Sequence, residues 1–156
     1  MKIVDIPNYK KLEIKNIVLD YNGTIANGGK VIQKLKELLK RLCQEYSVYV
    51  ITADTFGSVK QELIDFNLEV VVLKSSNHTN EKAEFIDSLD ATKTVALGNG
   101  NNDSLMLKKA ALSIAIIEKE GCSTKAILNS DIVCTDITDA LDILLNTKKL
   151  IATLRC

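Results

Sequence analysis

Four short groups of polar residues could carry the chemistry of this chain. The first is Asp20-Tyr21-Asn22-Gly23-Thr24, directly after an apolar run. The others are Thr52-Ala53-Asp54, Lys82, and the run Gly98-Asn99-Gly100-Asn101-Asn102-Asp103. They supply two carboxylates, a hydroxyl and an ammonium, which are the groups that bind anions and hold cations in proteins. If the fold brings them together, they form one charged site.

The first group is open to two interpretations when it is considered alone. An apolar run that ends in turn residues is typical of a buried strand, which would place Asp20 at a strand end. However, Asn22-Gly23 between apolar residues is also the strongest short hairpin signal. The elements further along the chain must decide between a strand-end site and a hairpin.

Those elements are of two kinds, continuous apolar runs and segments whose apolar residues recur at helical spacing. Continuous apolar runs predict strands at 17–20, 48–51, 70–73, 94–97, 112–116 and 132–134, the last at an edge. Helices are predicted between and after them, at 31–42, 58–66, 81–89, 104–110, 123–128, 136–145 and 149–154. Continuously apolar strands that alternate with helices indicate a parallel sheet covered on both faces. The predicted fold class is therefore α/β, a three-layer sandwich with a mostly parallel, Rossmann-like sheet.

The 156 residues predict one domain, since the chain shows no linker and no internal repeat. Within it we expect an N-terminal β ribbon at 1–15, a core at 17–134 and a C-terminal helical segment at 136–156. In a parallel sheet the carboxyl ends of the strands share one edge, where ligands bind. Asp20, Thr52 and Asp103 follow three of those ends, and Lys82 belongs to the helix after another. This arrangement favours the strand-end site.

Composition argues against several other kinds of protein. Lys plus Arg and Asp plus Glu are equal at 20 each, and aromatic residues make up 4%, which disfavours nucleic acid as a partner. No apolar run approaches the ~20 residues that span a membrane, so we expect no membrane partner and a cytoplasmic location. Four scattered cysteines and one histidine, His78, disfavour a zinc site.

In order along the chain, the four groups resemble the four motifs of the haloacid dehalogenase (HAD) superfamily of phosphohydrolases. The resemblance covers about residues 17–134. It is strongest to the soluble, capless proteins that are similar to the phosphorylation domain of P-type ATPases, because of Thr52-Ala53-Asp54 and the Gly-x-Gly-x-Asn-Asp pattern that ends in Asp103. It implies an enzyme, a phosphatase-type hydrolase that acts on a phosphorylated substrate.

The resemblance implies a role for each group. Asp20 would be the nucleophile that forms an aspartyl phosphate. Thr52, with the backbone N–H of Ala53, would bind the phosphoryl oxygens, and Lys82 would neutralise their charge. Lys74 is a rival for this lysine, although Lys82 fits the family pattern better because it opens the predicted helix.

Two further sets of residues complete the implied site. Tyr21, Asn22 and Asn102 would adjoin the phosphate, although Asn102 could instead cap the next helix. Mg²⁺ would be held by Asp20, Asn22 through its backbone carbonyl, Asn99 and Asp103. A dinucleotide-binding function for Gly98 and Gly100 is disfavoured, since Asp103 stands where that fingerprint needs a third glycine.

The chain departs from the family pattern at two positions. Asn22 stands where most of these phosphatases carry an aspartate that serves as general acid and base. General acid–base help contributes typically about 10²–10⁴ in rate, so we expect slow turnover. Asn99 replaces a usual metal-binding aspartate and should weaken the affinity for Mg²⁺. The alternative is therefore a non-catalytic or weakly active phosphoacceptor, a regulatory interaction domain.

The spacing of the motifs leaves no room for a cap domain. Between Asp20 and Thr52 there is space for a short flap at 25–31 and one helix. The site should therefore be open to solvent. Because a neighbouring subunit often covers such open sites in this superfamily, we expect a homo-oligomer.

Overall fold

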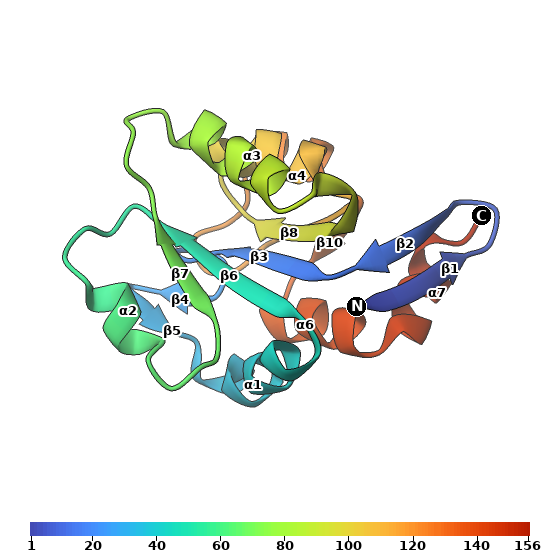
Figure 1. The fold of residues 1–156 in the computed structure, drawn as a ribbon, viewed down its shortest axis with the longest axis horizontal. Helices are drawn as coiled ribbons and strands as arrows, with labels where there is room; N and C mark the ends of the chain where they lie inside the picture. The colour runs from blue at the N-terminus through green and yellow to red at the C-terminus, as the bar shows by residue number, and fades with distance from the viewer.

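The computed structural model describes all 156 residues and contains one sheet of six parallel strands between layers of helices (Figure 1). The strands are β3 (Asn16–Asp20), β6 (Ser47–Thr52), β7 (Glu69–Val72), β8 (Thr94–Gly98), β9 (Leu112–Ile116) and β10 (Ile132–Cys134). Their order is β10-β9-β8-β3-β6-β7, so β3 lies near the centre and β10 at an edge. The predicted α/β class with a three-layer, parallel sheet is confirmed.

Helices cover both faces of this sheet. On one face lie α1 (Lys36–Glu45), α6 (Ile137–Leu145) and α7 (Thr147–Leu154). On the other face lie α3 (His78–Ser88), α4 (Ser104–Lys109) and α5 (Thr124–Leu128). Figure 1 shows α3 and α4 above the sheet and α1 and α6 below it. None of these helices is long and apolar enough to cross a membrane.

The segment between β3 and β6 contains a small hairpin and α1, with no inserted domain. The hairpin pairs β4 (Ala26–Asn27) with β5 (Lys30–Val31). Gly28 and Gly29 form its turn with φ of 60° and 80°, which is the backbone conformation that two-residue hairpin turns require. The short α2 (Ser58–Glu62) contacts β5 and ends earlier than the predicted 58–66.

The first two strands form an antiparallel ribbon outside the main sheet. β1 (Lys2–Ile6) pairs with β2 (Lys10–Ile14), and their alternate residues are buried. The chain end returns to this ribbon, because the Cys156 N–H donates to the Pro7 carbonyl at 3.2 Å. In Figure 1 the C-terminus accordingly lies beside the β1–β2 turn.

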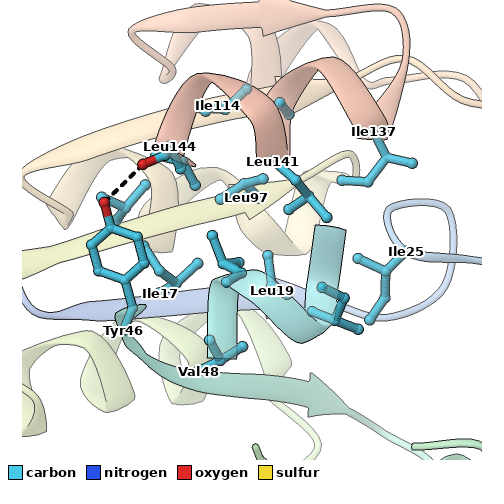
Figure 2. Packing of buried hydrophobic residues seen from close by; sticks show 14 of the residues in the cluster. Ile17, Leu19, Ile25, Tyr46, Val48, Leu97, Ile114, Ile137, Leu141 and Leu144 are labelled. Carbon is cyan, nitrogen blue, oxygen red and sulfur yellow. Dashed lines mark hydrogen bonds between the residues drawn. The ribbon is translucent and has the colours of Figure 1, made fainter. Parts of the chain in front are cut away.

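The two faces of the sheet bury apolar side chains in separate clusters of very different size. Successive residues of a strand point to opposite faces, so Ile17 and Leu19 join one cluster and Val18 joins the other. The larger cluster has 31 buried residues and extends from α1, α6 and α7 to α2 and the β1–β2 ribbon, and the smaller has 8 under α3, α4 and α5. Figure 2 shows part of the larger cluster, where the Tyr46 hydroxyl donates to the Leu144 carbonyl at 2.8 Å.

The four cysteines are free thiols that differ in burial. Cys43 and Cys134 belong to the larger cluster, Cys122 packs partly buried against the smaller one, and Cys156 is exposed. Burial raises the pKa of Cys43 to about 11 and also raises the pKa values of Cys134 and Cys122. The three buried or partly buried thiols are therefore held in their neutral form.

Candidate active site

Asp20 is the last residue of β3 and lies at the carboxyl edge near the centre of the sheet. Only 9% of the residue is exposed. Its Oδ1 accepts a hydrogen bond from Lys82 Nζ at 2.8 Å, and its Oδ2 accepts a longer one from the Thr24 hydroxyl at 3.3 Å. The chain continues from β3 into the Tyr21–Ala26 turn, so the strand-end interpretation of this stretch is confirmed and the hairpin forms only further on.

Lys82 connects the two buried carboxylates of the site. Besides Asp20, its Nζ donates to Asp103 Oδ1 at 2.7 Å and to Asn102 Oδ1 at 3.3 Å. The side chain is almost fully buried, with 3% of the residue exposed. Lys74 is exposed, and only its backbone N–H is engaged, with Glu81. The structure therefore brings Lys82, and not Lys74, to Asp20.

The helix that carries Lys82 begins earlier than the sequence predicted. Asn77 caps α3 by accepting from the Asn80 N–H, so the helix starts at His78 and Lys82 lies in its second turn. Helical side chains tilt toward the N-terminus of their helix. From the second turn a lysine can therefore extend back to the edge of the sheet, which explains why a residue inside the helix still contacts the end of β3.

Asp103 is completely buried and uses both of its carboxylate oxygens. Oδ1 accepts from Lys82, and Oδ2 accepts from the backbone N–H groups of Asn99 at 3.0 Å and Gly100 at 2.9 Å. This close approach requires a glycine at position 98, because a Cβ there would lie 2.6 Å from the Asp103 carboxyl carbon. Asp103 thus fixes both the glycine-rich loop and the ammonium of Lys82.

Burial and the neighbouring charges shift the pKa values of Asp20 and Lys82. Burial, and next the negative charge of Asp103, raise the pKa of Asp20 to about 7, although Lys82 and Thr24 oppose the shift. Burial alone would lower the pKa of Lys82, but Asp20 and Asp103 outweigh it and raise that pKa. With both carboxylates ionised the group carries an excess negative charge, which a bound cation would offset.

A cavity of about 250 Å³ opens beside this group at the edge of the sheet. It is lined by Asp20, Tyr21, Asn22, Ile51, Thr52, Ala53, Leu73, His78, Lys82, Asn99, Gly100 and Asn102. The Thr52 hydroxyl accepts from the Asp54 N–H at 3.0 Å, which orders the loop after β6. All the residues predicted to bind phosphate therefore share one cavity wall. Asn102 contacts Lys82 there, and the residue at the N-cap position of α4 is Asp103.

The predicted metal ligands differ in which of their oxygens are free. The Asn99 side-chain oxygen accepts no hydrogen bond, and its amide nitrogen donates to the Gly121 carbonyl at 3.2 Å. No backbone N–H bonds to the Asn22 carbonyl. Asp103 Oδ1 accepts only the bond from Lys82, whereas Asp103 Oδ2 already accepts two backbone N–H groups. The free oxygens of Asn22 and Asn99, with Asp20 Oδ2, form a donor set that suits Mg²⁺.

Two residues of this region were not predicted from the sequence to belong to the site. His78 lines the cavity, and Glu120 approaches Gly23, where a Cβ would lie 2.4 Å from Glu120 Oε2 and 2.3 Å from Asn99 Nδ2. Gly23 also has φ of 78°, so both space and backbone conformation demand glycine there. The polar loop before α3 was a signal for His78, whereas the sequence contains none for Glu120 because it depends on how the 117–123 loop folds back.

Two proteins of Methanocaldococcus jannaschii are similar to this chain in sequence. The uncharacterized protein MJ0073 is 59% identical over 63 residues, which are 40% of this chain and 68% of that protein. The uncharacterized protein MJ0072 is 46% identical over 39 residues, which are 25% of this chain and 89% of that protein. The chain belongs to the family of MJ0073. No described family model matches it.

The solved structures that share the fold of this chain include phosphatases of the HAD superfamily. One is the 3-deoxy-D-manno-octulosonate 8-phosphate phosphatase of Moraxella catarrhalis, in complex with magnesium, phosphate and the sugar (TM-score 0.70, 16% identity, 91% of this chain and 94% of that one). Another is a phosphoserine phosphatase (TM-score 0.59, 17% identity, 85% of this chain and 98% of that one). The catalytic domain of the CPx-ATPase CopB-B also shares the fold (TM-score 0.60, 23% identity, 73% of this chain and 45% of that one). Identities this low establish the common fold alone.

Proposed function

We propose that this protein is a Mg²⁺-dependent phosphohydrolase that acts through an aspartyl phosphate at Asp20. The observation that carries the proposal is the buried Lys82 ammonium, which lies 2.8 Å from Asp20 and 2.7 Å from Asp103 at the edge of a cavity. A strand-end carboxylate with a cation held this firmly beside it is suited to receive a phosphoryl group. The fold shared with HAD phosphatases supports the same chemistry.

In this proposal the cavity wall binds the three phosphoryl oxygens. The Thr52 hydroxyl and the Ala53 N–H lie at the end of the neighbouring strand β6 and line the same cavity as Asp20. Lys82 neutralises charge on the phosphoryl group while Asp20 attacks phosphorus. Tyr21 and Asn22 contribute backbone N–H groups beside the nucleophile, and Asn102 keeps the ammonium in place through its 3.3 Å contact.

The residues present also fit a magnesium ion. It would be held by Asp20 Oδ2, the Asn22 carbonyl, the Asn99 amide oxygen and Asp103 Oδ1, each of which has a free lone pair. Bound Mg²⁺ supplies positive charge that stabilises the phosphoryl oxygens and offsets the excess negative charge of the site. The carboxamide at Asn99 lowers the charge of the donor set, so we expect a weaker affinity than a carboxylate there would give.

Turnover in this proposal is slow because Asn22 cannot exchange a proton with the leaving group. The loss of general acid–base help from this position corresponds to roughly 3–5 kcal/mol of barrier. The aspartyl phosphate should therefore be comparatively long-lived.

Beryllofluoride with Mg²⁺ tests the site directly, since it mimics an aspartyl phosphate. We expect the pair to raise the Tm of the protein and a small phosphate donor to leave a phosphorylated peptide that contains Asp20. Asp20→Asn should remove both effects while the fold persists, because an amide can still accept from Lys82. Asp65→Asn, an exposed carboxylate with no hydrogen bond to the site, is the matched control. Absence of both the shift and the labelling at every Mg²⁺ concentration would refute the proposal.

Asn22 and Asn99 also favour a second candidate, a phosphoacceptor domain whose phosphorylated state is the functional product. The two candidates share the labelling of Asp20 and differ in the fate of the bound phosphoryl group. A phosphatase releases many equivalents of inorganic phosphate for each protein molecule, whereas a phosphoacceptor retains about one. Counting released phosphate against labelled Asp20 over several hours separates them.

Four further expectations from the sequence remain predictions. The likeness to the phosphorylation domain of P-type ATPases is supported by the shared fold with the CopB-B domain and by the absence of an inserted domain between β3 and β6. We also propose that the chain is a single domain in a cytoplasmic homo-oligomer, in which a second copy covers the open cavity. Small-angle scattering measures the oligomeric state, and a monomeric mass would overturn that part.

A further inference from the structure

His78 is the one histidine of the chain and lies on the wall of the cavity that contains Asp20 and Asn22. It is half-buried, and neither of its ring nitrogens has a hydrogen-bond partner in the protein. A polar side chain that faces a cavity without a protein partner is free to contact a molecule that binds there. No other cavity-lining side chain of this protein combines such freedom with the ability to exchange a proton at neutral pH.

The position of His78 in α3 explains why its ring faces the cavity. His78 and Lys82 are four residues apart, so they lie on the same side of the helix, one turn from each other. Lys82 is directed to Asp20, and His78 occupies the turn nearer to the helix N-terminus. The imidazole therefore lies on the same side as the reacting group and closer to solvent, where the leaving group of a substrate would depart.

His78 has no evident structural role. The cap of α3 is the Asn77 side chain, and His78 belongs to neither apolar cluster. The charged groups that face it are Glu81 on its own helix, Lys82 and, across the cavity, Asp20. The segments opposite contribute the uncharged Thr52, Ala53 and Asn22.

We propose that His78 is the general acid and base of this site and supplies part of the proton transfer that a carboxylate at position 22 would provide. The inference rests on the proposed phosphohydrolase function. In the first step Asp20 attacks phosphorus, the bond from phosphorus to the leaving oxygen breaks, and the imidazolium of His78 gives its proton to that oxygen. The products are the aspartyl phosphate, a neutral alcohol and a neutral imidazole.

The second step returns every group to its initial state. The neutral imidazole of His78 accepts a proton from a water molecule as that water attacks phosphorus. The bond from phosphorus to the Asp20 oxygen breaks, which releases inorganic phosphate and restores the carboxylate. His78 is then protonated again. Histidine suits both roles because its charge changes between pH 5 and 8.

Two substrates with different leaving groups test the proposal. p-Nitrophenyl phosphate releases an oxygen that is stable as an anion, whereas glycerol 2-phosphate releases one that needs a proton. His78→Gln should reduce kcat/KM for glycerol 2-phosphate by about 10²-fold or more, the usual contribution of a general acid. For p-nitrophenyl phosphate the loss in the phosphoryl-transfer step should be several-fold at most. Glu84→Gln, an exposed change on the same helix, should alter neither.

Beryllofluoride separates a failure of this inference from a failure of the proposed function. His78→Gln should keep the Tm shift with Mg²⁺ and beryllofluoride, because that complex needs Asp20 but no proton transfer. In saturating Mg²⁺ it should also flatten the dependence of kcat/KM on pH between 5 and 8. Equal losses for both substrates, or no loss for either, would overturn the role of His78. If the wild-type protein gives no beryllofluoride shift, the underlying function fails as well.

Discussion

The two faces of the central sheet are built differently. The face under α1, α6 and α7 belongs to an apolar cluster of 31 buried side chains that extends into the β1–β2 ribbon, whereas the cluster under α3, α4 and α5 has only 8. The buried charged residues of the helical layers, Lys82 and Asp103, belong to the smaller face. A large apolar cluster contributes hydrophobic stabilisation in proportion to its buried area, and buried charges contribute little or oppose it.

The residues that stabilise the fold and the residues that could carry out chemistry therefore lie on different faces of the sheet. The larger face can hold β3 in place by apolar packing alone, through Ile17 and Leu19. The smaller face can then carry a buried ammonium and two carboxylates at the end of the same strand without having to stabilise the fold. β3 belongs to both faces, and so it links the apolar cluster directly to Asp20.

The largest effect should come from breaking the charge group on the smaller face. Lys82→Met leaves Asp20 and Asp103 buried without their cation. We expect a loss of about 3–5 kcal/mol in the free energy of unfolding at pH 8, measured by urea denaturation. The loss should be smaller at pH 5, where Asp20 can bind a proton. Lys74→Met is the exposed control, and an equal cost for both variants would contradict the comparison.

Truncation of one buried leucine to alanine on each face tests whether the stability of the fold and the function of the site depend on different faces. Leu141→Ala in the larger cluster and Leu107→Ala in the smaller one each remove a fully buried side chain. Each should cost about 2–5 kcal/mol of unfolding free energy. Only Leu107→Ala should also weaken the beryllofluoride shift, because Leu107 lies in the helix that directly follows Asp103. Equal weakening in Leu141→Ala would show that the faces are not separate.

Asn22→Asp should restore the carboxylate that the family pattern expects at this position and so raise the activity of the site on the smaller face. We expect phosphate release to increase by about 10²-fold, the lower end of the range for general acid–base help, because His78 already supplies part of it. Steady-state release of inorganic phosphate measures the change. The double variant with His78→Gln should retain most of the gain. A rate that stays unchanged would mean that proton transfer does not limit turnover.

The last effect is the dependence of stability on pH in the absence of metal. Burial and Asp103 raise the pKa of folded Asp20 to about 7 from its ordinary value of 3.8. The folded state therefore holds a proton that the unfolded chain releases, and the free energy of unfolding should fall as pH rises from about 4 to 7. Thermal melts in chelator should show this fall in the wild type and a flatter profile in Asp20→Asn. Identical profiles would mean that Asp20 is ionised throughout.

Much of the fold could be predicted because each element has its own pattern. The continuous apolar runs around Val18 and Ala96 indicated parallel strands, and the spacing of Leu35, Leu39 and Leu42 indicated a helix. Helix starts were predicted less well. The polar loop before Lys82 hides the cap at Asn77, since asparagine is as common in turns as at helix starts.

The site could be predicted only as far as strand ends indicate it. Asp20, Thr52 and Lys82 share one cavity, as parallel strand order requires. Which contacts they make depends on packing that no local pattern encodes. Asp103 binds two backbone N–H groups and Lys82, a geometry set by the close approach at Gly98, and its role as a metal ligand remains a prediction.

The free cysteines have a consequence for experiment. Cys43 and Cys134 are buried on the larger face, and Cys122 lies partly covered on the smaller one. A thiol reagent applied in short pulses would therefore modify Cys122 whenever the active-site face opens and Cys43 only when the apolar cluster itself comes apart. The native sequence thus contains separate reporters for local and global opening, and mass spectrometry of the modified peptides can time the two motions in the same sample.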